Sequence, residues 1–395
     1  MLSSTTVAVT RCVSYELGEV SRAVAEALSL LGGLEAFARE GQTVLLKPNL
    51  LSAKAPDTAA ATHPAVVEAV AREVLRIGAT PVIGDSPPFR GQIALRYEHL
   101  LRVTGMRQAA DRLGIDTVSL DRPWREIEIG GKLFRKMPVA ARFLDADVVI
   151  SLPKLKTHEL TAYTGAVKNV FGVVPGLKKS QLHLQAAEDP RQFAQMIVDI
   201  FGACRPTLSI MDAVIGMEGQ GPTVGAPKEI GLILASADAV ALDAVALEIV
   251  GIAPESVDTT RLAAEQGFGE ARLERIEILG ESLDGARVKG FVPSPTVGGG
   301  MSQVPERWRP LLRNQFVPMP RVRADRCVGC GDCAAVCAIG AMTLADHRGK
   351  RVARADQRTC IACYCCDEAC PHGAIDVRKG WIGEIVKRTR RGPRA

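Results

Sequence analysis

The chain has 395 residues and a formal net charge of +5, with 47% hydrophobic and 24% charged residues. This length predicts two or three domains with a large core, and the composition is that of a globular protein. Its most apolar window, 239–250, is interrupted by Asp243 and Glu248 and is too short for a transmembrane segment. With 4% aromatic residues and no basic helix or stacking platform, no nucleic-acid binding is indicated.

The first 280 residues alternate short β-branched runs with longer helical patterns, which predicts an α/β domain with a mainly parallel sheet and flanking helices. Thr62 is the predicted cap of one helix, with Pro64 in its first turn. The predicted strands are 6–10, 43–46, 81–84, 143–152, 207–211 and 229–235, and residues 272–279 close the α/β part. The predicted helices are 15–40, in which Gly32-Gly33 is a candidate break, 62–78, 192–201 and 238–249.

Polar side chains follow two of these strands. Lys47 and Asn49 come after the strand 43–46, and Asp85 and Ser86 come after the strand 81–84. Ligands of open α/β sheets bind beyond the carboxyl ends of the strands, so we expect these residues to contribute to a binding site. The alternative, that they only turn the chain and meet water, stays open.

The end of the strand 143–152 is the most cationic part of the α/β region. Several cations, an amide, two hydroxyls and two histidines predict a site for a carboxylate or a phosphate. Neither the G-x-x-x-x-G-K-[ST] nor the G-x-G-x-x-G nucleotide motif is present. His158 and His183 leave metal binding open as an alternative. The residues concerned are Lys154, Lys156, His158, Lys168, Asn169, Lys178, Lys179 and His183.

Residues 281–320 are rich in proline and glycine, which predicts a linker or an extended wrap between two domains. The last segment, 379–395, is basic. From residue 376 onward the chain has seven basic and two acidic residues, a difference of +5, so the rest of the chain is neutral. We expect a solvated tail, and a docking role toward an acidic partner or a membrane surface stays open.

Between these segments, at 321–378, eight of the eleven cysteines form two copies of the spacing C-x2-C-x2-C-x3-C. The spacing resembles that of bacterial ferredoxins and predicts a small ferredoxin-like α+β domain with two [4Fe-4S] clusters. In these proteins the fourth cysteine of each run binds the other cluster. The two ligand sets are then Cys327, Cys330, Cys333 and Cys370, and Cys360, Cys363, Cys366 and Cys337.

Other uses of these cysteines fit less well. Disulfides do not suit eight thiols at such short gaps, and the third and fourth cysteines of each run argue against zinc. Ala338 stands where the second copy has Pro371, which changes a turn and not a ligand. Cys365 is extra, and we interpret it as a packed thiol that binds no iron. No signal peptide is indicated, so a cytoplasmic location is expected, where thiolates stay reduced.

The α/β part resembles the family of domain of unknown function 362, whose members often carry a C-terminal ferredoxin module. This resemblance implies a fold similar to that of the nickel-pincer lactate racemases. It does not identify an activity. The matching segments are Lys47-Pro48-Asn49, Thr62-His63-Pro64, Gly84-Asp85-Ser86-Pro87, residues 154–158, residues 164–172, Asp212 and Gly219-Gln220-Gly221-Pro222.

Together these features predict an iron-sulfur oxidoreductase that passes low-potential electrons to an anionic small-molecule substrate. Lys156, His158 and Lys168 are the candidate catalytic residues, which position the anion, stabilise developing charge or supply a proton. The candidate substrate-binding residues are Lys47, Asn49, Asp85, Ser86, Lys154 and Asn169.

Two other functions stay open. In one, the chain is a non-catalytic electron-transfer or scaffold subunit that docks a partner redox enzyme. In the other, the α/β domain keeps the racemase-like fold and the ferredoxin part is regulatory. A redox partner protein is expected in the leading interpretation. Substrate identity, a flavin or nickel cofactor and the oligomeric state are not decided by the sequence.

Overall fold

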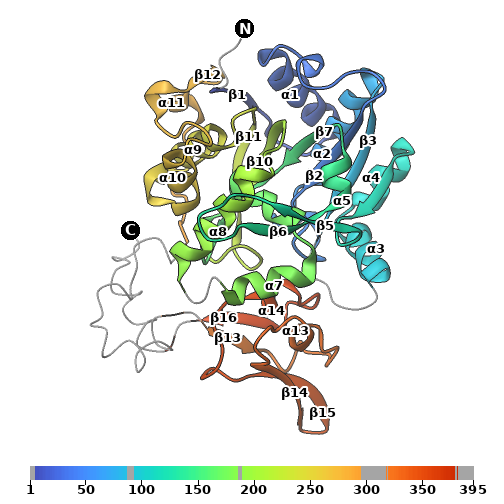
Figure 1. The fold of residues 1–395 in the computed structure, drawn as a ribbon, viewed down its shortest axis with the longest axis vertical. Coiled ribbons are helices and arrows are strands. Elements are labelled where there is room, and N and C mark those ends of the chain that lie inside the picture. Colours follow the sequence, from blue (N-terminus) through green and yellow to red (C-terminus); the bar gives the residue numbers. More distant parts are fainter. Residues whose placement is uncertain are drawn as a thin grey trace.

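The structure is a computed structural model that describes residues 5–86, 93–185, 189–294, 317, 319–378 and 380. A large sheet domain with helices on both faces is followed by a small unit formed by the cysteine-rich segment (Figure 1). The predicted fold class is confirmed in both parts.

The main sheet has ten strands, and eight of them follow the order β12-β1-β11-β10-β7-β2-β3-β4. Most neighbouring strands in it are parallel, whereas β11 is antiparallel to both β1 and β10. Strand β8 pairs with β10 and with β9 beside the main path. The strands are β1 (Thr6–Arg11), β2 (Thr43–Pro48), β3 (Thr80–Asp85), β4 (Asp116–Ser119), β7 (Val148–Leu152), β8 (Lys154–His158), β9 (Ala162–Tyr163), β10 (Leu208–Glu218), β11 (Ala226–Ser236) and β12 (Glu277–Gly280).

Both faces of the sheet are buried because successive side chains of a strand point to opposite faces. On β2, Val44 and Leu46 pack in one core, and Leu45 packs in the other. The first core lies against α1 (Leu17–Leu30), α2 (Pro64–Arg76), α3 (Ile93–Val103) and α4 (Met106–Leu113). The second lies against α6 (Gly165–Asn169), α8 (Pro190–Ala203), α9 (Ala239–Ile249) and α10 (Asp258–Glu265). No helix in the described part of the chain is long and apolar enough to span a bilayer.

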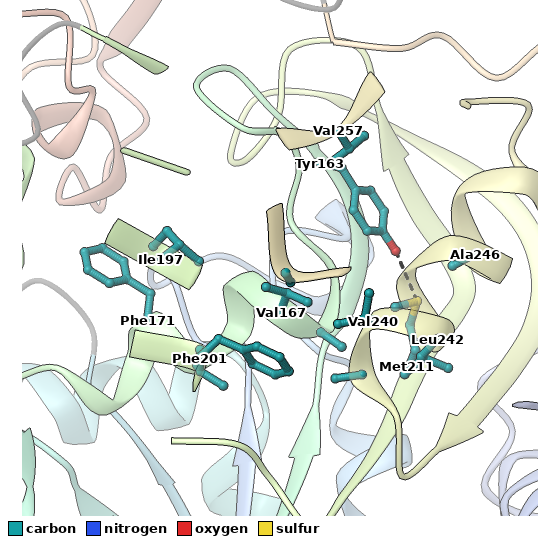
Figure 2. Close-up of a cluster of buried hydrophobic side chains, with 14 of the residues drawn as sticks. Tyr163, Val167, Phe171, Ile197, Phe201, Met211, Val240, Leu242, Ala246 and Val257 are labelled. Carbon is teal, nitrogen blue, oxygen red and sulfur yellow. Dashed lines mark hydrogen bonds between the residues drawn. The ribbon is translucent and has the colours of Figure 1, made fainter. Parts of the chain in front are cut away.

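The second core contains the buried Tyr163, whose hydroxyl donates to the Met211 sulfur at 3.4 Å (Figure 2). Val167, on the short helix α6, lies in the same cluster. This packing is relevant to the site because α6 also carries Lys168 and Asn169. The helix is therefore fixed to the core by one face and presents polar residues on another.

Two local predictions were wrong in detail, and a third was right only in part. The predicted helix 15–40 ends at Leu30, and the break foreseen at Gly32-Gly33 is present, with Gly33 at φ +86°. His63, not Thr62, caps α2, because the Ala65 amide donates to the His63 Nδ1 while the Thr62 hydroxyl donates to the Leu152 carbonyl. The predicted strand 143–152 begins only at residue 148, because the short helix α5 (Ala141–Asp145) precedes it.

The remaining elements are a hairpin of β5 (Trp124–Glu128) and β6 (Lys136–Ala140), helices α7 (Gly176–Gln185) and α11 (Leu283–Ala286), and the cysteine-rich unit. That unit contains β13 (Met319–Val322), α13 (Asp332–Ala335), β14 (Met342–His347), β15 (Lys350–Ala355), α14 (Cys365–Glu368) and β16 (Ile375–Arg378). Strand β13 pairs with β16, and β14 pairs with β15.

The predicted linker and tail lie largely outside the described residues. Residues 295–316 and 318 of the linker, and all of the tail except Gly380, are among those not described. The start of the predicted linker packs on the sheet domain, where Ala286 is buried. Further along, the Gly219 amide donates to the Val292 carbonyl at 2.7 Å.

Candidate functional site

Two cavities in the cysteine-rich unit are each lined by cysteines from both cysteine runs. Cysteine cavity I is lined by Cys327, Cys330, Cys333 and Cys370. Cysteine cavity II is lined by Cys337, Cys360, Cys363 and Cys366, and also by Cys365. Apart from Cys365, these are the two sets that the crossed ferredoxin pattern predicts, and all eleven cysteines of the chain are free thiols. Each set fits a [4Fe-4S] cluster, because its four thiols surround an otherwise mostly apolar cavity.

The backbone around the cysteines is repeated between the two copies. Gly329 and Gly331 of the first copy have φ values of +72° and +85°, and the equivalent Ala362 and Tyr364 of the second have +54° and +61°. Left-handed backbone is unfavourable for residues other than glycine, so the surrounding structure must hold the second loop in this conformation. Backbone amides also donate to sulfur, for example from Ala353 to Cys327 at 3.4 Å. Such bonds tune the reduction potential of a bound cluster.

A third cavity, here called the lysine cavity, lies between the sheet domain and α14. Its volume is about 50 Å³. A water molecule needs roughly 10–15 Å³ of such space, so the cavity has room for only a few water molecules or one small molecule. Its polar lining residues are Lys47, Asn49, Asp85, Ser86, Lys168, Asn169, Lys179 and Glu368, with Phe171 and Cys365 beside them.

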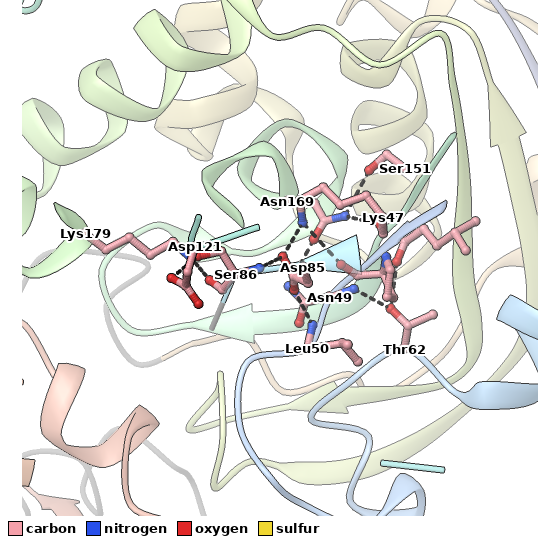
Figure 3. A network of polar contacts seen from close by, with 12 residues as sticks. Lys47, Asn49, Leu50, Thr62, Asp85, Ser86, Asp121, Ser151, Asn169 and Lys179 are labelled. Carbon is pink, nitrogen blue, oxygen red and sulfur yellow. Dashed lines mark hydrogen bonds and ion pairs between the residues drawn. The ribbon is translucent and has the colours of Figure 1, made fainter. Parts of the chain in front are cut away.

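Lys47 and Asp85 form a buried ion pair at 2.9 Å between Nζ and Oδ1 (Figure 3). They lie at the adjacent carboxyl ends of the parallel strands β2 and β3. The Asp85 carboxylate also accepts bonds from the backbone amides of Leu50 at 2.7 Å and Ser86 at 2.9 Å. A Cβ on Gly172 would lie 2.2 Å from Asp85 Oδ1, so glycine is required there for the close approach.

Asn49 and Asn169 form a second contact across the cavity wall. The Asn49 Nδ2 donates to the Asn169 Oδ1 at 3.2 Å, and the Asn169 Nδ2 donates to the Ser151 hydroxyl at 2.9 Å and to the Lys47 carbonyl at 3.2 Å. Asn169 is thereby fixed to the ends of β2 and β7. The Asn49 Oδ1 has no hydrogen-bond partner among the described residues.

Lys168 is directed into the cavity by the short helix α6. The buried Asp243 accepts the amides of Ala166 at 2.6 Å and Val167 at 2.9 Å at the start of this helix. The Lys168 ammonium lies 6.0 Å from the ring centre of Phe171, and the described residues contain no hydrogen-bond or ion-pair partner for it. Lys168 is only 9% exposed, so it is a buried cation without a fixed counterion.

Lys179 was among the expected cations but not among the predicted site residues. It donates to the Ser86 carbonyl. The Ser86 hydroxyl donates to Asp121 Oδ1 at 2.8 Å, and this carboxylate also accepts the Gly176 amide at 2.6 Å at the start of α7. Asp121 therefore links β3 to the helix that carries Lys179. Asp121 was not predicted as a site residue, because it follows an irregular connection and no sequence motif marks it.

Glu368 and Cys365 enter the lysine cavity from the cysteine-rich unit, and neither was predicted to do so. Cys365 also lines cysteine cavity II, so the two cavities share a wall. A signal for Glu368 did exist, because buried acidic Asp367 and Glu368 stand where the first cysteine run has Ala334 and Ala335.

Further contacts join the two parts of the chain. The Thr223 hydroxyl donates to Asp367, and the Gln220 Nε2 donates to the Val377 carbonyl at 3.1 Å. Arg96 of α3 forms an ion pair with Asp332 at 2.6 Å. The lysine cavity is therefore completed only when the cysteine-rich unit is docked on the sheet domain.

The three polar residues of β8 that were predicted for the site do not line this cavity. Lys154 forms an ion pair with Asp212 at 2.7 Å and donates to the Tyr15 hydroxyl at 2.7 Å. Lys156 donates to the Ala60 carbonyl at 2.5 Å. His158 accepts the Leu160 amide at its Nδ1, and its Nε2 lies 3.9 Å from Glu368 Oε1. The predicted cations therefore separate into two groups.

Burial dominates the electrostatics of the lysine cavity. It lowers the pKa of Lys168 to about 8, although the nearby Glu368 acts in the opposite direction. It also lowers the pKa of Lys179 to about 8, against the opposing effect of Asp85. Burial likewise raises the pKa of Glu368, which Lys168 opposes. The pKa values of two buried lysines thus lie near neutral pH and that of the carboxyl beside them is raised, and such shifted values are typical of functional sites.

The comparisons with known proteins agree with this arrangement of two parts. A family model described as "Domain of unknown function (DUF362)" matches residues 44–248, and one described as "4Fe-4S dicluster domain" matches residues 326–374. The chain is 38% identical over 271 residues to the thylakoid-associated protein sll1697 of Synechocystis sp., which covers 67% of this chain and 79% of that protein.

Among solved structures, the lactate racemase apoprotein from Thermoanaerobacterium thermosaccharolyticum matches with a TM-score of 0.38 and 12% identity. That match covers 60% of this chain and 56% of the racemase chain. The DUF362 model, by contrast, matches more than half of the chain. The chain therefore belongs to the DUF362 family and carries a 4Fe-4S dicluster ferredoxin domain in its C-terminal part.

Proposed function

We propose that the protein is an iron-sulfur oxidoreductase that delivers electrons from two [4Fe-4S] clusters to a small anion in the lysine cavity. When bound, the clusters would supply low-potential one-electron reduction. The single observation that supports this proposal best is the buried ammonium of Lys168, which forms no ion pair with any described residue and faces a cavity that shares Cys365 with cysteine cavity II.

The lysine cavity suits a small anion. Lys168 and Lys179 would bind the negative charge, and the Asn49 amide, whose Oδ1 has no partner in the described part of the chain, would orient a polar group. Lys47 is neutralised by Asp85 and would fix the cavity wall. A volume of about 50 Å³, room for roughly three to five water molecules, suits a small substrate.

The roles assigned to β8 change in this proposal. Lys156 and His158 lie outside the cavity. They would influence the charges of Glu368 and Lys168 electrostatically and would not contact the substrate. Lys154 would hold the start of β8 to β10 through Asp212. Lys168 keeps its proposed role as the catalytic cation, because it alone of the three predicted catalytic residues lines the cavity.

A non-catalytic electron-transfer subunit is the second candidate. Glu368 favours it, because this carboxylate already places one negative charge among the lysines and leaves little space. A reducing cytoplasm, in which thiolate ligands stay reduced, belongs to both proposals.

An anaerobic experiment on the full chain distinguishes them. The reconstituted clusters are photoreduced, and formate, acetate, bicarbonate, nitrite and phosphate are added one at a time while the visible absorption is followed. Reoxidation by one anion in wild type, and its loss in Lys168→Met, supports the oxidoreductase. The non-catalytic electron-transfer subunit is favoured instead by two results together. No anion binds to the protein or reoxidises its clusters, and a partner protein does reoxidise them.

A further inference from the structure

A group of unpaired cations surrounds the hairpin β14–β15, and we call it the basic hairpin surface. The surface consists of five exposed cations, named at the end of this paragraph, and of Asp346, so its net charge is +4. Asp346 lies opposite Arg351 in the strand register. Many exposed arginines elsewhere are neutralised, as Arg112 is by Glu68. In the described residues no such ion pair is formed by the exposed cations of this surface, which are Arg326, Arg348, Lys350, Arg351 and Arg354.

The hairpin lies directly over cysteine cavity I. Leu344 of β14 and Ala353 of β15 line that cavity, and the Ala353 amide donates to the Cys327 sulfur at 3.4 Å. A Cβ on Gly329 would lie 2.4 Å from the Arg351 carbonyl oxygen, so the cysteine loop and the hairpin are in close contact. The cations of the hairpin are therefore held next to this cavity by the backbone itself.

Cysteine cavity I also reaches the surface. Cys330 is exposed, and the neighbouring Val328 is 55% exposed although it is apolar. Cysteine cavity II lies toward the sheet domain instead, since it shares Cys365 with the lysine cavity. In Figure 1 the hairpin forms the end of the molecule farthest from the sheet. The two cavities thus have different neighbours, solvent for the first and the lysine cavity for the second.

We propose that the basic hairpin surface docks an acidic one-electron carrier protein, which reduces the group bound in cysteine cavity I. One electron leaves the reduced centre of the carrier and one is gained in the cavity, with no bond formed or broken. Charge complementarity argues for an acidic partner, because opposite charges steer association and fix the docked orientation. The exposed Val328 provides an apolar contact beside Cys330. The inference requires the clusters, but not the reduction of an anion.

The test compares two triple variants of the full chain with the same change in charge. In Arg348→Glu/Lys350→Glu/Arg351→Glu the basic hairpin surface is reversed. In the matched control, Arg39→Glu/Arg142→Glu/Lys289→Glu, three exposed cations of the sheet domain are reversed. Equal iron content and equal photoreduction by 5-deazariboflavin, a small neutral reagent, establish that both variants hold their clusters. The probe is a purified acidic 2[4Fe-4S] ferredoxin.

Two readouts are used. The first is the dissociation constant of the oxidised probe, which is measured by calorimetry at about 20 mM and about 300 mM salt. The second is the rate at which the reduced probe bleaches the oxidised clusters. We expect the hairpin variant to weaken binding and slow reduction by about tenfold or more at low salt, with a smaller effect at high salt, and the control to match wild type.

Equal binding and equal rates in all three proteins would overturn the inference. It would also be overturned if vesicles with anionic lipids bound wild type and not the hairpin variant while the ferredoxin rates stayed equal, because the surface would then be a membrane contact. If the protein reduces no anion in the lysine cavity, ferredoxin binding and cluster reduction would still be as expected here. The docking proposal and the proposed function can therefore be refuted independently.

Discussion

Cys365 and Glu368 lie at the two ends of the single-turn helix α14, and both side chains line the lysine cavity of the sheet domain. Cys365 lines cysteine cavity II as well. One short helix of the cysteine-rich unit therefore joins a cavity suited to an iron-sulfur cluster to a cavity suited to an anion. The proposed function depends on this connection.

Substitutions of Cys363 and Cys365 should have very different effects on the iron content, although the two residues are only two positions apart. Cys363→Ser removes a predicted ligand and should lower the iron content from about eight to about four atoms per chain, or lower still if the domain unfolds. Cys365→Ser should keep all of the iron, since Cys365 belongs to neither set of four. Iron and sulfide assays with the visible spectrum measure both. Loss of iron in Cys365→Ser would show that our assignment of the ligands is wrong.

Anion binding should depend on pH through Lys168. Its folded pKa is lowered to about 8, so the ammonium is present below pH 8 and the affinity for an anion should fall as the pH rises through that value. Lys168→Met should weaken binding by about 10- to 100-fold at pH 7, the magnitude of a hydrogen bond to a charged group. Lys168→Arg should keep more affinity than wild type above pH 8, because arginine stays charged. Titration of acetate against the visible circular dichroism of the clusters measures this.

The same lowered pKa has a consequence for stability. Between about pH 8 and the ordinary lysine value, the unfolded chain holds a proton at Lys168 that the folded chain lacks, so the free energy of unfolding should rise with pH in this window. Lys168→Met should remove this contribution and be more stable than wild type at pH 7. Urea denaturation of the apoprotein at pH 7 and pH 9 tests the sign. An equal change in the free energy of unfolding between pH 7 and pH 9 in the two proteins would contradict it.

Gly172→Ala should displace the Lys47–Asp85 ion pair in the wall of the lysine cavity. The added Cβ would lie 2.2 Å from Asp85 Oδ1 and 2.3 Å from Lys47 Nζ, so the buried ion pair must move. We expect a loss of about 1–3 kcal/mol in the free energy of unfolding and weaker anion binding. The control is Gly18→Ala in α1, where a Cβ meets nothing within 4 Å. It should be neutral or stabilise by up to about 1 kcal/mol.

Glu368→Gln removes a negative charge from the lysine cavity and keeps the shape of the side chain. Because the carboxylate would repel a bound anion, acetate affinity should rise, by about tenfold. Asp367→Asn is the matched control, with the same loss of charge on the neighbouring residue, which binds Thr223 and does not line the cavity. If both variants changed the affinity equally, a general effect of net charge would explain the result and not the position of Glu368.

The sequence by itself determined the features that depend on local spacing. The gaps between the cysteines predicted both sets of four, because a cluster constrains nearby thiols along the chain. The alternation of hydrophobic residues predicted the α/β class, and the parallel strands then brought Lys47 and Asp85 together as expected. The boundaries that failed, at Thr62 and at Phe143, depended on contacts outside their own segments.

Only the tertiary structure decided which cations share a site. Lys154 and Lys168 were both predicted for one anion site, but Asp212 pairs with the first and the end of α6 directs the second into the cavity. Glu368 lies 200 residues beyond Lys168 in the chain, and no local pattern relates the two. They meet because the cysteine-rich unit docks on the carboxyl edge of the sheet, an outcome of packing between surfaces that are formed only after each part has folded.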